Sequence, residues 1–135
     1  MDDATDVLPE RFELIREVGA GGMGVVYEAH DQVLGRTVAV KVFHDRTPET
    51  IDRVKQEFRV AAAVRHPNLV RLGELFEHAG SLCFSMELVD GVPITQYCDE
   101  RRLPVPDRLA LFASVGHAVQ HAHQKGVIHR DLKPS

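Results

Sequence analysis

Short apolar runs separated by glycine, proline and polar turns dominate the chain up to Val89. Runs of about four to eight residues that are rich in β-branched side chains and bounded by turn residues are typical of β-strands. The pattern predicts five strands, over 12–18, 25–29, 37–43, 69–76 and 82–89.

One helix interrupts this strand-rich part. Thr47 followed by Pro48 is typical of a helix start, because threonine caps free N–H groups and proline has no N–H to satisfy. The sequence His-Pro-Asn at 66–68 predicts where the helix ends. Apolar residues between these points recur at spacings of three, four and three, as in an amphipathic helix: Ile51, Val54, Phe58 and Ala61.

The pattern becomes helical after Asp90 and Gly91. It predicts a short helix over 94–101 and a longer one over 106–125, with Gly126 as the C-terminal stop. One face of the longer helix is apolar and carries Leu109, Phe112, Val115 (or Gly116), Val119 and Ala122.

The chain thus divides into a polar lead-in over 1–10, a strand-rich part over 11–89 and a helical part over 90–135. Its 135 residues are enough for one domain. Hydrophobic residues make up 44% and charged residues 27%, as in soluble globular proteins. The net charge of −4 gives no reason to expect nucleic acid or an anionic membrane as a partner.

We expect neither a membrane segment nor a secretory signal. No apolar run approaches the roughly 20 residues that span a bilayer, and the acidic start at Met1 lacks an apolar core. Cys83 and Cys98 are isolated in the sequence, which is typical of reduced thiols. These features predict a cytoplasmic protein.

Three glycines, Gly19, Gly21 and Gly24, fit the pattern G-x-G-x-x-G. Glycine lets the backbone bend sharply and bring its N–H groups close to phosphate. A dinucleotide-binding fold requires a helix after such glycines, whereas residues 25–27 predict a strand. We therefore favour a glycine flap between two strands, with an ordinary glycine-rich hairpin turn as the alternative.

Lys41 lies within the predicted strand 37–43, on the same face as Ala39. Its stem can extend to solvent, or a carboxylate can hold its ammonium inside. Glu57 falls at the margin of the apolar face of its helix, where a carboxylate is costly unless it is paired. We therefore expect Lys41 to pair with Glu57, with a tolerated boundary glutamate as the alternative.

Asp131 is the best candidate for a catalytic base. Arg130 and Lys133 flank it and would keep its carboxylate ionised. A turn after a long helix suits a base that accepts a hydroxyl proton. The alternative is an ordinary turn aspartate.

The histidines of the longer helix have a spacing that can bind metal. His117 and His121 are four apart on one helix face, with His123 nearby. The metalloprotease pattern has glutamate after its first histidine, however, and here that residue is Ala118. Surface or locally hydrogen-bonded histidines are favoured, and no metal site is expected.

Together, these segments resemble a protein kinase. Five matches follow the family's order: the glycine-rich loop at 19–26, Val-Ala-Val-Lys at 38–41, Glu57 ahead of His-Pro-Asn-Leu-Val at 66–70, the gatekeeper and hinge Met-Glu-Leu-Val at 86–89, and the catalytic loop His-Arg-Asp-Leu-Lys-Pro at 129–134. The Leu-Lys-Pro ending is similar to that of serine/threonine kinases. The sequence of the glycine-rich loop is similar to that of the bacterial, eukaryotic-like branch.

The resemblance implies an α+β fold, in which an antiparallel five-stranded sheet with one helix (the N-lobe) precedes the first helices of an incomplete helical C-lobe. It implies ATP as phosphoryl donor and a protein Ser/Thr hydroxyl as acceptor. Asp131 would orient or deprotonate that hydroxyl, and Lys133 would neutralise the transferring phosphoryl group. The residues implied to bind ATP are Val18, Gly19, Ala20, Gly21, Gly22, Met23, Gly24, Val26, Ala39, Lys41, Glu57, Met86, Glu87 and Val89.

The family holds Mg²⁺ through an asparagine, which would come directly after Ser135, and through the aspartate of an Asp-Phe-Gly segment. Neither is in the sequence. We therefore expect this chain to bind nucleotide weakly and not to turn over.

An N-terminal kinase fragment is the favoured interpretation. The alternative is a non-catalytic kinase-like module that docks on a partner protein, with the apolar face of the 106–125 helix as the surface for that partner. A globular domain with accidental motifs is a third interpretation.

Overall fold

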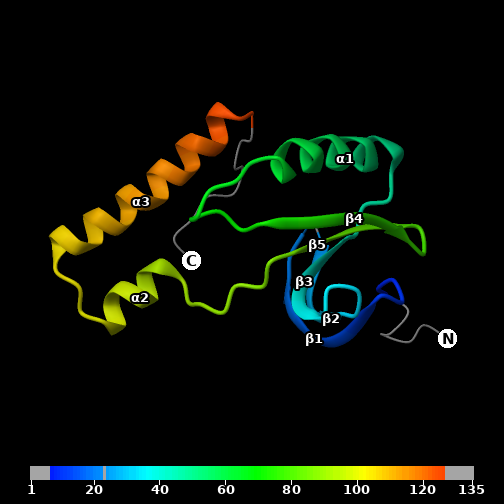
Figure 1. Ribbon diagram of the computed structural model, residues 1–135, viewed down its shortest axis with the longest axis horizontal. Helices are drawn as coiled ribbons and strands as arrows, with labels where there is room; N and C mark the ends of the chain where they lie inside the picture. The colour runs from blue at the N-terminus through cyan, green and yellow to red at the C-terminus, as the bar shows by residue number, and fades with distance from the viewer. Residues whose placement is uncertain (1–6, 23, 127–135) are drawn as a thin grey trace.

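The computed structural model describes residues 7–22 and 24–126. One helix lies along a five-stranded sheet, and two more helices extend beyond one end of the sheet (Figure 1). The elements are β1 (Phe12–Ala20), β2 (Gly24–Asp31), β3 (Arg36–Phe43), α1 (Pro48–Ala62), β4 (Leu72–His78), β5 (Ser81–Met86), α2 (Ile94–Glu100) and α3 (Val105–Gln124).

The sheet has the order β1-β2-β3-β5-β4, and every neighbouring pair is antiparallel. β3 is the central strand, and its run from Val38 to Val40 is buried. The predicted antiparallel five-stranded sheet, with one helix between its third and fourth strands, is confirmed.

Most strand ends lie within two residues of the prediction, and two differ from it by three residues. β4 begins at Leu72 rather than at residue 69, and β5 ends at Met86 rather than at residue 89. Local hydrogen bonds give the reason for the later start of β4. The N–H groups of Asn68 and Leu69 donate to Nδ1 (3.0 Å) and to the carbonyl (3.1 Å) of His66, so the chain turns here instead of pairing.

The core has two clusters, one on each face of the sheet. The first contains Leu8, Phe12, Ala29, Val38, Val40 and Cys83. The second lies under α1 and contains Phe43, Val54 and Leu82, with Phe84 packed against them. The sequence predicts a loose lead-in over 1–10, and the structure differs at Leu8, which is only 2% exposed. A single leucine in a polar segment carries no periodic signal, so its burial could not be predicted.

The helix α1 begins as predicted. Thr47 has extended backbone angles at the N-cap and accepts a hydrogen bond from the Thr50 N–H at 3.4 Å, and Pro48 follows in the first turn. Val54 packs into the second core cluster, and the ring of Phe58 lies 5.3 Å from that of Phe84 on β5. These contacts fix how the helix is rotated over the sheet.

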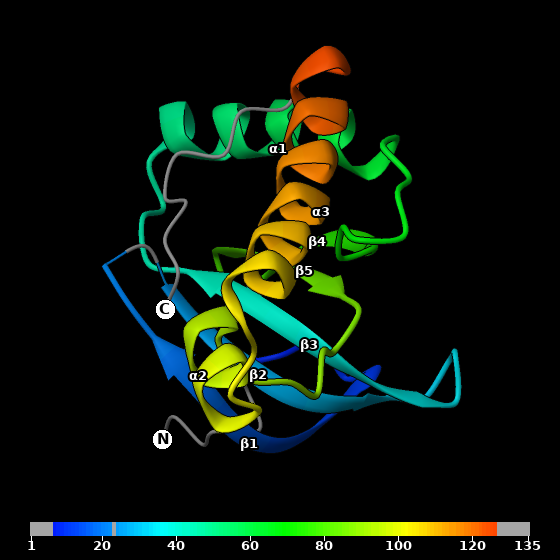
Figure 2. The ribbon, with the colours of Figure 1, turned by 90° about the vertical axis from the view of Figure 1, so that its left-hand side faces the viewer.

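The helices α2 and α3 form an arm that lies beyond one end of the sheet in Figure 1 and in front of the sheet in Figure 2. Arg108 joins them, since its Nε donates to the Leu103 carbonyl and its Nη1 to Asp99, each at 2.8 Å. The end of α3 lies beside the end of α1, where the rings of His66 and His121 are 5.3 Å apart. Gly126 has a φ of +91° and ends α3 as predicted. No helix in the described part of the chain is long and apolar enough to cross a membrane.

Candidate functional site

The glycine loop joins the end of β1 to the start of β2. The Gly21 N–H donates to the Gly24 carbonyl at 2.9 Å, which closes the turn. A Cβ at Gly24 would lie 2.1 Å from the Val42 carbonyl oxygen, so only glycine fits there. The same test finds no atom within 4 Å at Gly19, Gly21 or Gly22. The loop is therefore packed tightly at one end and open above its tip.

Four of the predicted residues share one face of the sheet. Val26 pairs with Lys41 across β2 and β3, and Ala39 pairs with Met86 across β3 and β5. Because directly paired residues lie on the same face and positions two apart repeat it, all four side chains belong to one surface. Ala39 is buried and the other three are half-buried. This surface continues from the base of the glycine loop.

The two predicted residues at the margins of this surface are exposed. Val18 lies where the register of β1 shifts, between Glu17 and Gly19, and is 45% exposed. Val89 lies beyond the end of β5 and is 61% exposed. The site is therefore open to solvent at both sides.

The predicted ion pair between Lys41 and Glu57 stays a prediction. The Lys41 ammonium lies 5.3 Å from the centroid of the Phe43 ring. Glu57 is exposed on α1. Val54 and Phe58 take the inward positions of this helix, and Lys55 pairs with Glu77 of β4 at 2.5 Å.

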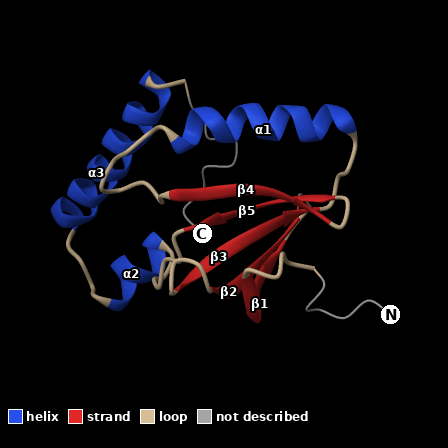
Figure 3. Cartoon of the chain, turned by 45° about the vertical axis from the view of Figure 1, so that its right-hand side comes forward, coloured by secondary structure: helices blue, strands red, loops and turns tan. Residues whose placement is uncertain are grey.

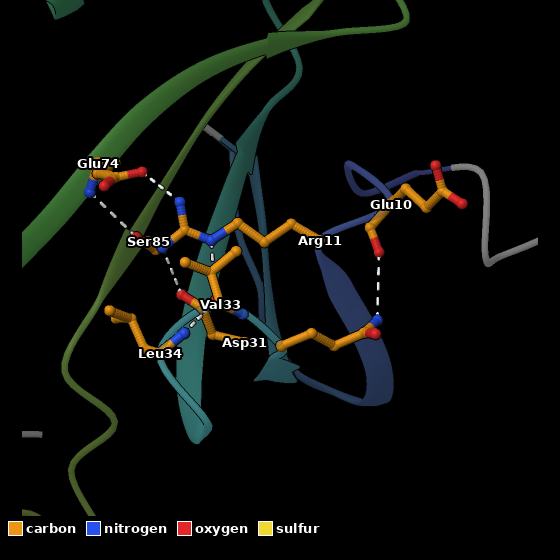
Figure 4. Close-up of polar contacts among 8 residues, drawn as sticks. Glu10, Arg11, Asp31, Val33, Leu34, Glu74 and Ser85 are labelled. Atoms are coloured by element: carbon orange, nitrogen blue, oxygen red, sulfur yellow. Dashed lines mark hydrogen bonds and ion pairs between the residues drawn. The ribbon is translucent and has the colours of Figure 1, made fainter.

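Sequence analysis missed an ion-pair network around the buried Asp31, which holds the strand ends together (Figure 4). Arg11 Nε and Nη2 donate to the two carboxylate oxygens of Asp31, each at 2.8 Å, and Arg11 Nη1 pairs with Glu74 of β4. The Glu74 N–H in turn donates to Ser85 Oγ of β5 at 3.0 Å. The network links the start of β1 and the end of β2 to the far edge of the sheet.

Asp31 is the centre of this network and is completely buried. Its carboxylate also accepts from the N–H groups of Val33 and Leu34, at 2.9 and 3.1 Å. The Arg11 guanidinium, with these backbone donors, holds the pKa of Asp31 below its ordinary value. In the sequence, Asp31 is marked only by the turn that follows a predicted strand. Aspartates in such turns are usually exposed, so the burial of Asp31 could not be predicted.

Three of the predicted site residues belong to segments that the structure does not describe. The candidate base Asp131, Lys133 and the loop residue Met23 lie outside the described residues. Among the residues that are described, no group of three or more His, Cys, Asp or Glu side chains could hold a metal ion.

Comparison with known proteins agrees with this arrangement. The protein kinase domain model matches residues 12–135. The serine/threonine-protein kinase pkn2 of Myxococcus xanthus is 37% identical over 131 residues, which cover 95% of this chain and 16% of that protein. The DNA damage-responsive serine/threonine-protein kinase RqkA of Deinococcus radiodurans is 38% identical over 133 residues, covering 95% of this chain and 20% of that protein. The chain thus spans about a fifth or less of the length of these curated relatives.

A solved structure gives the same result for the fold. The crystal structure of the Mycobacterium tuberculosis PknI kinase domain superposes with a TM-score of 0.77 at 31% identity, over 98% of this chain and 56% of that one. The family model covers far more than half of the sequence, from the start of β1 onward. The chain belongs to the protein kinase domain family.

Proposed function

We propose that this chain is the nucleotide-binding part of a serine/threonine protein kinase, which transfers a phosphoryl group from ATP to a protein hydroxyl. The observation that carries the proposal is the common face of Val26, Ala39, Lys41 and Met86, at the base of a glycine loop with an open tip. An apolar strip for a flat ring thus lies beside a cation and a glycine loop with open space for phosphate.

The adenine ring would lie against Val26 and Ala39, because the small Ala39 side chain leaves room for a flat ring on this face of the sheet. The hinge would bind the edge of the ring. The Glu87 N–H already donates to the Arg71 carbonyl at 2.8 Å, so the Glu87 carbonyl is the group left to accept from the adenine amino group. The Val89 N–H would donate to the ring.

Lys41 would contact the α- and β-phosphates under the glycine loop, and Mg²⁺ would accompany the nucleotide and neutralise its phosphate charge. For that contact the ammonium must leave the Phe43 ring. An approach of Glu57 would hold it in the new position, as the Lys–Glu pair does in active kinases. By family resemblance, Asp131 and Lys133 would act on the hydroxyl and on the transferring phosphoryl group. The cytoplasm, where ATP is available, is the proposed location.

Lys41→Met is the direct test of the nucleotide site. With a ribose-labelled fluorescent ATP analogue and Mg²⁺, we expect saturable binding to the native chain and at least about tenfold weaker binding to the variant, because a charge-assisted phosphate contact is lost. Lys125→Met, which removes a lysine at the end of α3, is the matched control and should bind as the native chain does. Equal binding by all three proteins would contradict the proposal.

Transfer by the 135-residue chain is a separate question. We expect no phosphorylation of a protein substrate by the purified chain, because the family's metal-binding residues are not in its sequence. Phosphoryl transfer that depends on Lys41 would contradict this expectation.

A non-catalytic docking module is the second candidate, and the exposed face of α3 favours it. Leu109 is 63% exposed, Phe112 49% and Val115 36%, which is unusual for three neighbouring large apolar side chains on one helix face. A folded native chain that binds no nucleotide analogue would favour this candidate over the kinase.

A further inference from the structure

A cavity of about 600 Å³ lies outside the proposed nucleotide site. The loop after α1, the start of β4 and the end of β5 meet at one end of the sheet (Figure 3) and enclose it together with the start of β3. Met86 and Glu87 line both places, but Val26, Ala39, Lys41 and the glycine loop do not line this cavity. It is therefore a separate surface, on the other side of the hinge.

Three arginines from three different segments surround the cavity: Arg36 on β3, Arg65 in the loop after α1, and Arg71 before β4. All three are exposed, and none of their guanidinium groups has a hydrogen-bond or ion-pair partner in the described part of the chain. Arg11 and Arg108, by contrast, both pair with carboxylates.

The negative charge at this cavity is much smaller. Among the described residues, Glu87 is the only acidic one that lines it. Its carboxylate accepts from the backbone N–H of Arg71 at 3.2 Å, rather than from a guanidinium. The chain as a whole carries a net charge of −4, so this local excess of positive charge runs against the overall composition. A cluster of this kind attracts anionic groups.

Part of the cavity wall is apolar. Val38 is buried, and Leu69, Leu72 and Leu88 are half-buried around the cavity. A ligand that carries only phosphate would leave this wall in contact with water. A ligand with a large apolar side chain between carboxylates would cover the wall and pair with the guanidinium groups at the same time.

We propose that this cavity is a docking site for an acidic peptide segment with large apolar side chains between its carboxylates. The concave shape and the apolar wall favour a peptide over a membrane surface, which is flat, and over nucleic acid, which offers no such side chain. The site shares Met86 and Glu87 with the proposed nucleotide site, while its three arginines lie outside that site.

The test uses the full 135-residue chain without nucleotide and a fluorescein-labelled peptide, Glu-Glu-Leu-Phe-Glu-Glu-Asp, with anisotropy as the readout. We expect saturable binding that weakens about tenfold in Arg65→Glu and in Arg71→Glu. Arg53→Glu makes the same charge change at an exposed position of α1 outside the cavity and should leave binding unchanged. Equal weakening in Arg53→Glu would overturn the proposal, since it would show only a response to net charge.

Peptide variants provide a second measurement that does not depend on the folding of any protein variant. In one peptide variant, every Glu is replaced by Gln and the Asp by Asn. In the other, Leu and Phe are replaced by Ser. We expect both peptide variants to bind the native chain several-fold more weakly. Indifference to either replacement would overturn the proposal. Tighter binding of an RNA oligonucleotide or of anionic vesicles, lost in Arg65→Glu and Arg71→Glu, would assign the cavity to those ligands instead and would also overturn it.

Discussion

At the residue scale, Gly24 carries the tightest steric requirement of the glycine loop. A methyl group there would meet the Val42 carbonyl oxygen at 2.1 Å, and this oxygen belongs to the backbone of β3, which cannot move alone. We expect Gly24→Ala to lower the free energy of unfolding by about 2 kcal/mol, as overpacking does. Gly22→Ala, at a position with open space, should change it by less than about 0.5 kcal/mol. Urea unfolding followed by circular dichroism would measure both, and equal effects would show that the loop moves freely away from β3.

A second prediction at the residue scale concerns how the contribution of Asp31 to stability depends on pH. Its pKa is lowered in the folded state, so its contribution to stability is present above the unfolded pKa, about 3.9, and is lost as the pH falls through the folded value. We expect Asp31→Asn to cost about 3 kcal/mol at pH 7, since it leaves Arg11 with a neutral partner in a buried site. The difference between the native and variant chains should shrink below about pH 4.

Asp99→Asn is the matched control for the pH experiment. Asp99 pairs with Arg108 at 2.8 Å, but its side chain is 70% exposed. Surface pairs of this kind contribute about 0.5 kcal/mol. A cost for Asp31→Asn as small as that for Asp99→Asn would mean that the buried pair adds no net stability.

At the scale of elements, the periodic pattern predicted which segments are strands and helices, because apolar side chains recur with the period of the element that carries them. The rotation of α1 about its axis could not be predicted from the sequence. Glu57 and Lys55 are two positions apart and so lie on nearly opposite sides of the helix. The contact of Phe58 with Phe84, far away in sequence, decides which of them lies closer to the sheet. The pairing of Arg11 with Asp31 has the same origin, since β1 and β2 must first be in register.

The start of α1 gives a prediction at this scale. Thr47 caps the Thr50 N–H, while Asp45 accepts from the Thr47 N–H at 2.9 Å and from Thr50 Oγ1 at 2.8 Å. Thr47→Ala should cost about 1 kcal/mol of unfolding free energy, the usual value for a lost cap. Thr95→Ala, at an exposed position of α2 without such a role, should cost less than half as much. A neutral Thr47→Ala would show that Asp45 alone is enough to start the helix.

At the scale of the whole molecule, the sheet and the α2–α3 arm differ in how they are held. The five strands and α1 share two core clusters, whereas α2 and α3 contact the rest of the described structure sparsely, and α3 exposes its apolar face. The sequence predicted that apolar face, but its exposure depends on what else packs there, which no local pattern contains. We infer that the arm opens more easily than the sheet.

The two cysteines can measure this difference, because one lies in each part. Cys83 is 1% exposed in the sheet core, and burial raises the pKa of its thiol to about 11, so reaction requires the sheet to open. Cys98 is 2% exposed but sits in the short helix α2. With excess N-ethylmaleimide at pH 7.5, read by mass spectrometry, we expect Cys98 to react at least about tenfold faster than Cys83. Reaction of both at one rate, equal to the rate of global unfolding, would show that the arm and the sheet form a single cooperative unit.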